Sequence, residues 1–179
     1  MIVELRQYTV HPGRRDELIA LFDREFVETQ EAVGMTVLGQ FRDLDDPDRF
    51  VWLRSFADMA ARKDALTRFY GGPVWRAHRE QANATMIDSD DVLLLRPVGD
   101  DLPVPERDGR VAGLIVASMA PDDAGEEIAR LRTVHAENTF PALPIRTDVD
   151  VEVRLARADR AEPGPHRLRL APTGRSRIR

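Results

Sequence analysis

Residues 2–10, IVELRQYTV, and residues 49–56, RFVWLRSF, decide the fold of this chain. In both stretches successive side chains alternate in character, and β-branched and aromatic residues are frequent, which is typical of β-strands. Residues 37–42 read as another strand, and the polar turn at residues 43–48 favours a hairpin that joins it to the strand at 49–56. Residues 14–32 repeat apolar side chains at helical spacing, which predicts an amphipathic helix.

Two further helices and a strand complete the first half of the chain. Asp58 is placed to cap a helix that carries Leu66 and Phe69 on one face. Pro73 is placed to open the next helix, and residues 92–95 form a short apolar run that suits a buried strand. The resulting order, βαββαβ, predicts an α+β fold of the ferredoxin-like kind, in which an antiparallel sheet carries both helices on one face.

Alternation along the strands divides the predicted sheet into two faces. The apolar set, which is suited to contact with the helices, consists of Val3, Leu5, Val51 and Leu53. The opposite set mixes aromatic, polar and charged side chains and consists of Glu4, Arg6, Tyr8, Phe50, Trp52, Arg54 and Phe56, together with Gln40 and Arg42. This mixed face is too apolar for open water and too charged for an ordinary core, so we expect a second sheet to cover it.

The second half of the chain reads as a reduced, mostly β copy of the first. After a domain at residues 1–98, residues 99–109 are rich in Pro, Gly and Asp and are expected to form a linker. Residues 110–172 carry shortened or missing helices and four candidate strands, at 111–119, 127–135, 149–156 and 168–171. Residues 173–179 look like a frayed basic tail. A reduced second repeat that keeps its strands could still cover the first sheet, which would leave its own outer face in need of a partner. We therefore expect a homo-oligomer, namely a dimer.

Composition restricts the classes of function. The chain has 179 residues, a formal net charge of −5 and no cysteine. The missing cysteines exclude disulfides, thiolate nucleophiles and Cys-ligated metals, and the acidic balance speaks against a nucleic-acid-binding protein. Since there is neither an apolar run of membrane-spanning length nor the apolar core of a signal peptide, we expect a cytoplasmic protein without membrane partners.

Four segments of the first half resemble the sequence pattern of the NIPSNAP family: Val3–Gly13, which fits E-L-R-x-Y-x-x-x-x-G, Phe50–Phe56, Met59–Arg62 and Phe69–Trp75. The resemblance covers residues 1 to about 98 and implies a dimeric α/β barrel, in which two ferredoxin-like sheets face each other. The family commonly carries two such repeats, and the shortened second half departs from that pattern. Residues 137–144 resemble a loop between the middle strands of the second repeat in bacterial relatives.

The mixed face of the first sheet holds the strongest candidate binding site. Arg6 and Arg54 are expected to lie beside Tyr8 and Trp52. Two guanidinium groups next to two aromatic rings can hold an anionic, partly aromatic ligand by bidentate hydrogen bonds and stacking. The competing interpretation is structural, with Glu4 pairing the arginines while the aromatic rings fill the interface between the sheets.

His78 is a further candidate, because it follows Trp75 by one helical turn. The resemblance implies that histidines near the cleft between helices and sheet bind haem or act on small aromatic substrates in related barrel families. The competing interpretation is a half-buried histidine that is hydrogen-bonded to the backbone.

Motifs for nucleotide, metal or nucleophilic chemistry are absent from the sequence, including the P-loop, G-x-S-x-G and H-E-x-x-H. The four histidines are scattered, and the acidic clusters at residues 43–48 and 88–91 do not match a calcium-binding loop and read as solvated turns. We therefore expect no metal and no required cofactor.

Three hypotheses for function follow. The first is a NIPSNAP-like barrel of unassigned biochemical activity that binds a small anionic or aromatic molecule, assembles as an oligomer, or does both. The second, by analogy of fold, is a cofactor-independent oxygenase- or isomerase-like enzyme that acts on a small aromatic substrate. The third is a protein-interaction module.

Overall fold

The two stretches that predict the sheet are neighbouring antiparallel strands in the computed structural model, which describes residues 1–99, 102–107, 113–121 and 123–179. β1 (Ile2–Val10) lies between β3 (Arg49–Phe56) and β4 (Met86–Pro97), and β2 (Thr36–Asp43) flanks β3 on its other side. The sheet order β4-β1-β3-β2 and the chain order βαββαβ agree with the expected ferredoxin-like half.

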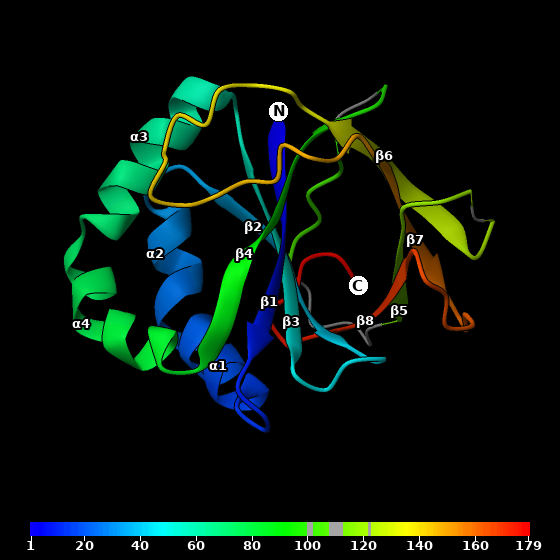
Figure 1. Cartoon of the computed structure of the whole chain (residues 1–179), viewed down its shortest axis with the longest axis horizontal. Coiled ribbons are helices and arrows are strands. Elements are labelled where there is room, and N and C mark those ends of the chain that lie inside the picture. Colours follow the sequence, from blue (N-terminus) through cyan, green and yellow to red (C-terminus); the bar gives the residue numbers. More distant parts are fainter. Residues whose placement is uncertain (100–101, 108–112, 122) are drawn as a thin grey trace.

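One layer of helices covers one face of this sheet (Figure 1). The predicted helix at residues 14–32 is divided into α1 (Arg15–Leu21), a π-helical turn η1 (Phe22–Phe26) and α2 (Val27–Glu31). α3 (Met59–Tyr70) begins after its predicted cap, Asp58, whose carboxylate accepts a hydrogen bond from the backbone N–H of Ala61. α4 (Pro73–Asn83) opens with proline, as expected. No helix in the described part of the chain is long and apolar enough to cross a membrane.

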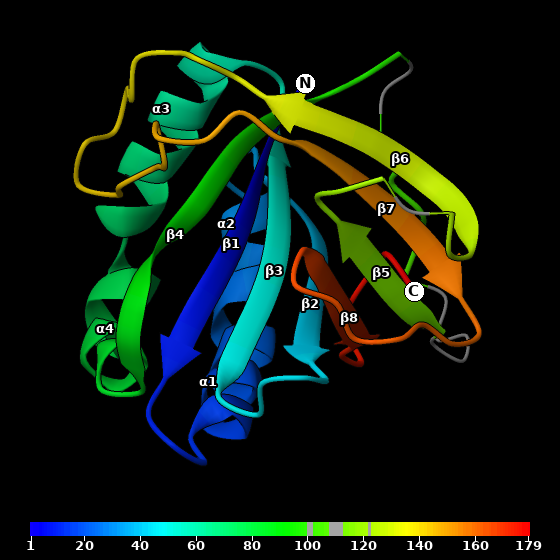
Figure 2. The ribbon, with the colours of Figure 1, turned by 45° about the vertical axis from the view of Figure 1, so that its right-hand side comes forward.

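The second half of the chain closes the sheet into a barrel (Figure 2). Its described strands are β5 (Leu114–Ser118), β6 (Glu126–Thr133), β7 (Glu152–Ala158) and β8 (Arg167–Pro172). β8 pairs with β2 and β6 pairs with β4, so the eight described strands form one closed barrel. All four strands overlap the predicted ones, although residues 110–112, where the second repeat and its first strand were expected to begin, lie outside the described residues. One chain thus provides all eight described strands of the barrel.

The assignment of the two sheet faces from the sequence is wrong. The apolar set that was expected to contact the helices points into the barrel, where Val3, Leu5 and Leu53 pack with second-half residues such as Leu131 and Leu155. The mixed set faces the helices instead. Its aromatic members pack with helix residues such as Leu18 and Leu66 in a second core, called the helix-side cluster below. The physical reason is that the described residues of the barrel core are apolar and would leave buried charges without partners. The helices, in contrast, bring polar side chains of their own to the mixed face.

Two segments that were expected to be loose are packed against the barrel. Leu102, in the described part of the predicted linker, is 2% exposed and belongs to the barrel core. The predicted frayed tail pairs with β2, because the N–H of Thr173 donates to the carbonyl of Gln40 and the N–H of Ile178 donates to that of Leu38. Ile178 is itself buried in the barrel core, and this apolar contact explains why the tail is held.

Candidate functional site

The register between β1 and β3 brings the predicted site residues together. Glu4 lies directly opposite Arg54, and Arg6 lies directly opposite Trp52. Because every second residue of a strand faces the same side, these four side chains and that of Tyr8 share the face that the helices cover. The charged members are at most 1% exposed, so their charges must be compensated inside the protein.

Glu4 is the centre of a buried charge cluster. Its Oε2 accepts hydrogen bonds from Arg6 Nη1 at 2.8 Å and from Arg54 Nε at 2.7 Å. Its Oε1 accepts a hydrogen bond from Nε of Arg62, on α3, at 2.7 Å. Burial alone would raise the pKa of Glu4, but the combined charges of Arg54, Arg6 and Arg62 hold that pKa well below its ordinary value.

The cluster of Glu4, Arg6, Arg54 and Arg62, called the arginine cluster below, contains three positive charges and one negative charge. Its remaining described side-chain hydrogen bonds go to neutral groups. Arg6 Nε donates to the hydroxyl of Tyr8, Arg54 Nη1 to the Oε1 of Gln30 and the Sδ of Met35, and Arg62 Nη1 to the Oδ1 of Asn138. Arg54 Nη2 and Arg62 Nη2 are buried and have no hydrogen-bond partner among the described residues. The arginine cluster therefore lacks negative charge and has free donors.

An aromatic cavity of about 30 Å³ borders the arginine cluster, because Tyr8 and Gln30, which accept hydrogen bonds from Arg6 and Arg54, line it together with Trp52. The rest of its lining is apolar or aromatic: Leu18, Phe22, Phe26, Phe69, Tyr70, Trp75, Ala82 and Met86. The guanidinium carbons of Arg6 and Arg54 lie 5.6 and 5.0 Å from the centre of the Trp52 ring, within the range of cation–π attraction. The indole N–H of Trp52 is buried and also lacks a described partner.

Of the five residues predicted for the site, four lie together at the arginine cluster and its aromatic cavity: Arg6, Tyr8, Trp52 and Arg54. His78 lies elsewhere. Its Nε2 is 3.4 Å from Glu25 Oε2, and its ring packs at 6.5 Å from that of Phe26 outside the cavity lining.

Sequence reasoning missed Arg62, Gln30 and Asn138. Arg62 is fully buried and precedes Leu66 by one turn, so it stands on the apolar face of α3. A charged residue at a core position of a helical stripe was the signal that could have found it. Asn138 comes from the connection between β6 and β7, and nothing in its local sequence indicates a contact with α3.

Asp23, in the π-helical turn, is a partly buried acid near the same helices. Burial raises the pKa of Asp23 to about 6, against the opposing charges of Arg175, Arg42 and Arg107. Its described hydrogen bond, from Gln40 Nε2, is long at 3.5 Å. The ionised form is therefore poorly stabilised in the folded protein.

We expect Asp23→Asn to stabilise the protein at pH 7 by about 1 kcal/mol, a value reduced for solvent screening of a partly exposed group. Since the folded-state pKa lies above the ordinary value of 3.8, the folded state binds more protons between about pH 4 and pH 6. The free energy of unfolding of the wild type therefore falls as pH rises through this window, and the variant should lack this contribution. Urea unfolding at several pH values measures this pH dependence of the free energy of unfolding. The control is Asp64→Asn, at an exposed position. Identical pH slopes for wild type and Asp23→Asn would contradict the expectation.

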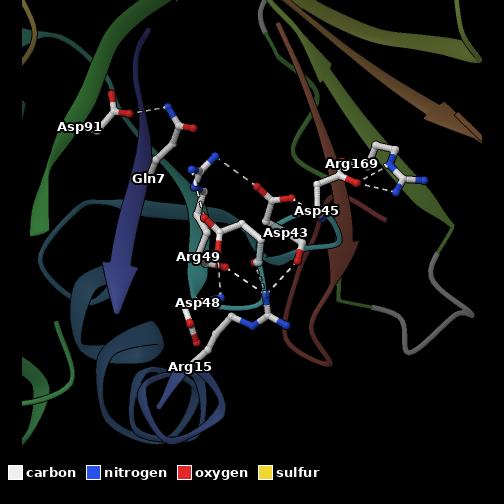
Figure 3. Close-up of polar contacts among 9 residues, drawn as sticks. Gln7, Arg15, Asp43, Asp45, Asp48, Arg49, Asp91 and Arg169 are labelled. Atoms are coloured by element: carbon white, nitrogen blue, oxygen red, sulfur yellow. Dashed lines mark hydrogen bonds and ion pairs between the residues drawn. The ribbon is translucent and has the colours of Figure 1, made fainter. Parts of the chain in front are cut away.

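Another cavity, of about 550 Å³, lies at one end of the barrel and is lined in part by the acidic turn at residues 43–48. Figure 3 shows the polar contacts of this turn. The turn is confirmed, since Asp43 accepts a hydrogen bond from the N–H of Asp45, and Arg169 pairs with Asp45 at 2.6 Å. Arg49 pairs with Asp46 at 3.1 Å. The charges at this end are thus balanced by neighbouring side chains, in contrast to the arginine cluster.

The second acidic cluster, residues 88–91, is not a turn between elements but lies within β4. Asp91 faces Gln7 of β1, whose amide donates to it at 3.0 Å (Figure 3). Pairing with β1 therefore overrides the turn preference of Asp. Among the residues that the structure describes, no group of three or more His, Asp or Glu side chains is placed to hold a metal ion.

Comparison with known proteins gives consistent matches. Residues 3–100 match the sequence model of the NIPSNAP family. An uncharacterized NIPSNAP-like domain protein from Burkholderia xenovorans is similar in structure, with a TM-score of 0.52 and 24% identity over 58% of this chain and 90% of its own. A NIPSNAP family protein from Agrobacterium tumefaciens gives a TM-score of 0.50 and 19% identity over 56% of this chain and 95% of its own. No match was found among curated proteins.

These likenesses concern the fold alone, because the identities are low. Each solved relative is matched along nearly its whole length by little more than half of this chain. The present chain therefore carries a large additional segment relative to them.

Proposed function

The chain belongs to the NIPSNAP family, and because membership assigns no activity, we propose from the site geometry that it binds a small molecule carrying an acidic group next to an aromatic ring. The observation that carries this proposal is the excess of positive charge in the arginine cluster. Its three guanidiniums are at most 1% exposed and share one carboxylate.

The acidic group of the ligand supplies the missing negative charge. Burying a cation without an anionic partner costs several kcal/mol, so a protein that needed the arginines only for structure would gain by matching them with acids. The unpartnered Nη2 groups of Arg54 and Arg62 are the donors that an anion satisfies. The aromatic lining of the cavity, from Trp52 to Trp75, favours a flat ring as the rest of the ligand.

The cavity admits an aromatic ring only after its wall moves, since about 30 Å³ holds roughly two water molecules. α4 is the part of the wall best suited to move. Its one fully buried residue is Ala82, and Trp75, which lines the cavity from α4, is itself partly exposed. The π-helical turn, which supplies Phe22 and Phe26 to the opposite wall, is a local irregularity of the kind often found at binding sites.

Benzoate is the simplest probe of this proposal. Both tryptophans of the chain, Trp52 and Trp75, line the cavity, so their fluorescence reports on its occupation. We expect saturable changes with benzoate and much weaker binding of benzamide, which has the same shape but no charge. Equal binding of the two compounds, or no saturable change with benzoate, would contradict the proposal.

We expect Arg54→Lys to weaken benzoate binding by about tenfold, because lysine keeps the charge but loses the planar fork that matches a carboxylate. Lysine is preferred to alanine because truncation would leave Glu4 short of a partner and destabilise the fold whatever the function. Arg49→Lys, on the same strand but at the barrel end, is the matched control and should leave benzoate affinity unchanged. Thermal melts of both variants serve to check that they are folded.

Two other hypotheses from the sequence are less well supported. No specific contact among the described residues favours a cofactor-independent enzyme or an interaction module over ligand binding. Homodimerisation stays a prediction. The eight described barrel strands all come from one chain, and we propose that β5–β8 take the place that the second sheet holds in a dimeric barrel.

A further inference from the structure

The connection between β6 and β7 leaves the barrel and crosses over α3 before it returns (Figures 1 and 2). Phe140 of this connection stacks on Tyr70, a cavity-lining residue, with ring centres 5.8 Å apart and an interplanar angle of 29°. Leu143 packs against the same helix-side cluster. The second half of the chain thus reaches the candidate site of the first half.

Asn138 is the polar residue of this connection that contacts the arginine cluster. Its Oδ1 accepts hydrogen bonds from Arg62 Nη1 and from the N–H of Phe140, both at 3.1 Å. Its Nδ2 donates to the carbonyl of Leu143 at 2.8 Å. These three bonds hold the amide in one orientation, with its oxygen toward Arg62.

The chemistry of residue 138 is informative because an aspartate has nearly the same shape as an asparagine. A carboxylate at this position would form a charge-assisted pair with Arg62 and would reduce the excess positive charge of the arginine cluster. The chain has a neutral acceptor there, and the adjacent acid, Glu137, is exposed to solvent. Arg62 is therefore held in place without being neutralised.

We propose that Asn138 is a positioning residue of the ligand site, which orients Arg62 while it leaves the charge of Arg62 available to the acidic group of the ligand. The proposal rests on the proposed function, and it assigns to the second half of the chain a part in ligand recognition. Asn138 lies beyond residues 3–100, the part of the chain that matches the family. The site is therefore completed by a segment outside the family-matching half.

The test is Asn138→Asp, with Asn83→Asp as the matched control, since Asn83 is exposed at the end of α4 and the charge change is the same. We expect Asn138→Asp to weaken benzoate binding by at least about tenfold. Its melting temperature reflects two opposing changes, the new charge-assisted pair with Arg62 and the lost bond from Nδ2 to the carbonyl of Leu143. The control should change neither quantity appreciably. A residue with a merely structural role would alter the melting temperature without this loss of affinity.

The possible results separate this proposal from the one on which it rests. If the wild type binds benzoate and Asn138→Asp binds it equally well, the role of Asn138 is wrong and the binding function stands. If the wild type does not bind benzoate, both are wrong.

Discussion

Replacing Glu4 by glutamine is expected to lower the free energy of unfolding by about 4 kcal/mol or more, which for a domain of this size approaches complete loss of the folded state. The change keeps the size of the side chain but removes the negative charge that three buried guanidiniums share. Urea unfolding followed by circular dichroism measures the effect.

Glu17→Gln is the matched control, because Glu17 also pairs with an arginine, Arg14, but both side chains are substantially exposed. Exposed pairs contribute little, so this variant should lose less than about 1 kcal/mol. A Glu4→Gln protein as stable as the control would mean that the charges of the arginine cluster are compensated by other groups. The arginine cluster would then have no unmet positive charge.

Gly125→Ala is expected to destabilise the protein by about 3 kcal/mol, because two costs combine at this position. The backbone has a φ of +74°, which side chains of L-residues rarely adopt, and an added Cβ would lie 2.1 Å from the carbonyl oxygen of Arg157 on β7. The strand that starts at Glu126 would have to shift relative to β7. Thermal and urea unfolding measure the loss.

Gly13→Ala separates the two costs. Gly13 has nearly the same φ, +76°, but no atom lies within 4 Å of the position that its Cβ would occupy. The free energy of unfolding of this control should fall only by the conformational cost, about 1 kcal/mol. Equal losses for the two variants would show that β6 and β7 are not closely packed at the start of β6, contrary to the barrel described above.

The strands and helices of the first half could be predicted because local patterns and pairing agree. β3 has the predicted bounds, and α3 follows the predicted cap, Asp58. The direction in which each sheet face points could not be predicted in the same way. Alternation separates Leu5 from Arg6 but does not say which of the two meets the helices, because that depends on which partners the rest of the chain supplies.

The part of the candidate site that lies on paired strands could be predicted from the sequence, whereas the part that comes from other elements could not. Arg6 and Arg54 share a strand face, so their proximity follows from pairing of β1 with β3. Arg62 and Asn138 reach the same place from a helix and from a distant connection, and such contacts depend on tertiary packing rather than on local pattern. His78 contacts Phe26 but does not line the cavity, because its spacing from Trp75 predicts a shared helix face and not which residues of that face reach the cavity.

The most direct test of the central claim, that the arginine cluster and its aromatic cavity bind an aromatic acid, is a crystal structure of the protein with 4-bromobenzoate. The anomalous signal of bromine locates the ring independently of the protein. We expect the bromine between the sheet and the helices, near Trp75, with the carboxylate at the free Nη2 groups of Arg54 and Arg62. An empty cavity at saturating ligand, or bromine bound elsewhere such as at the barrel end beside Asp43, would contradict the account.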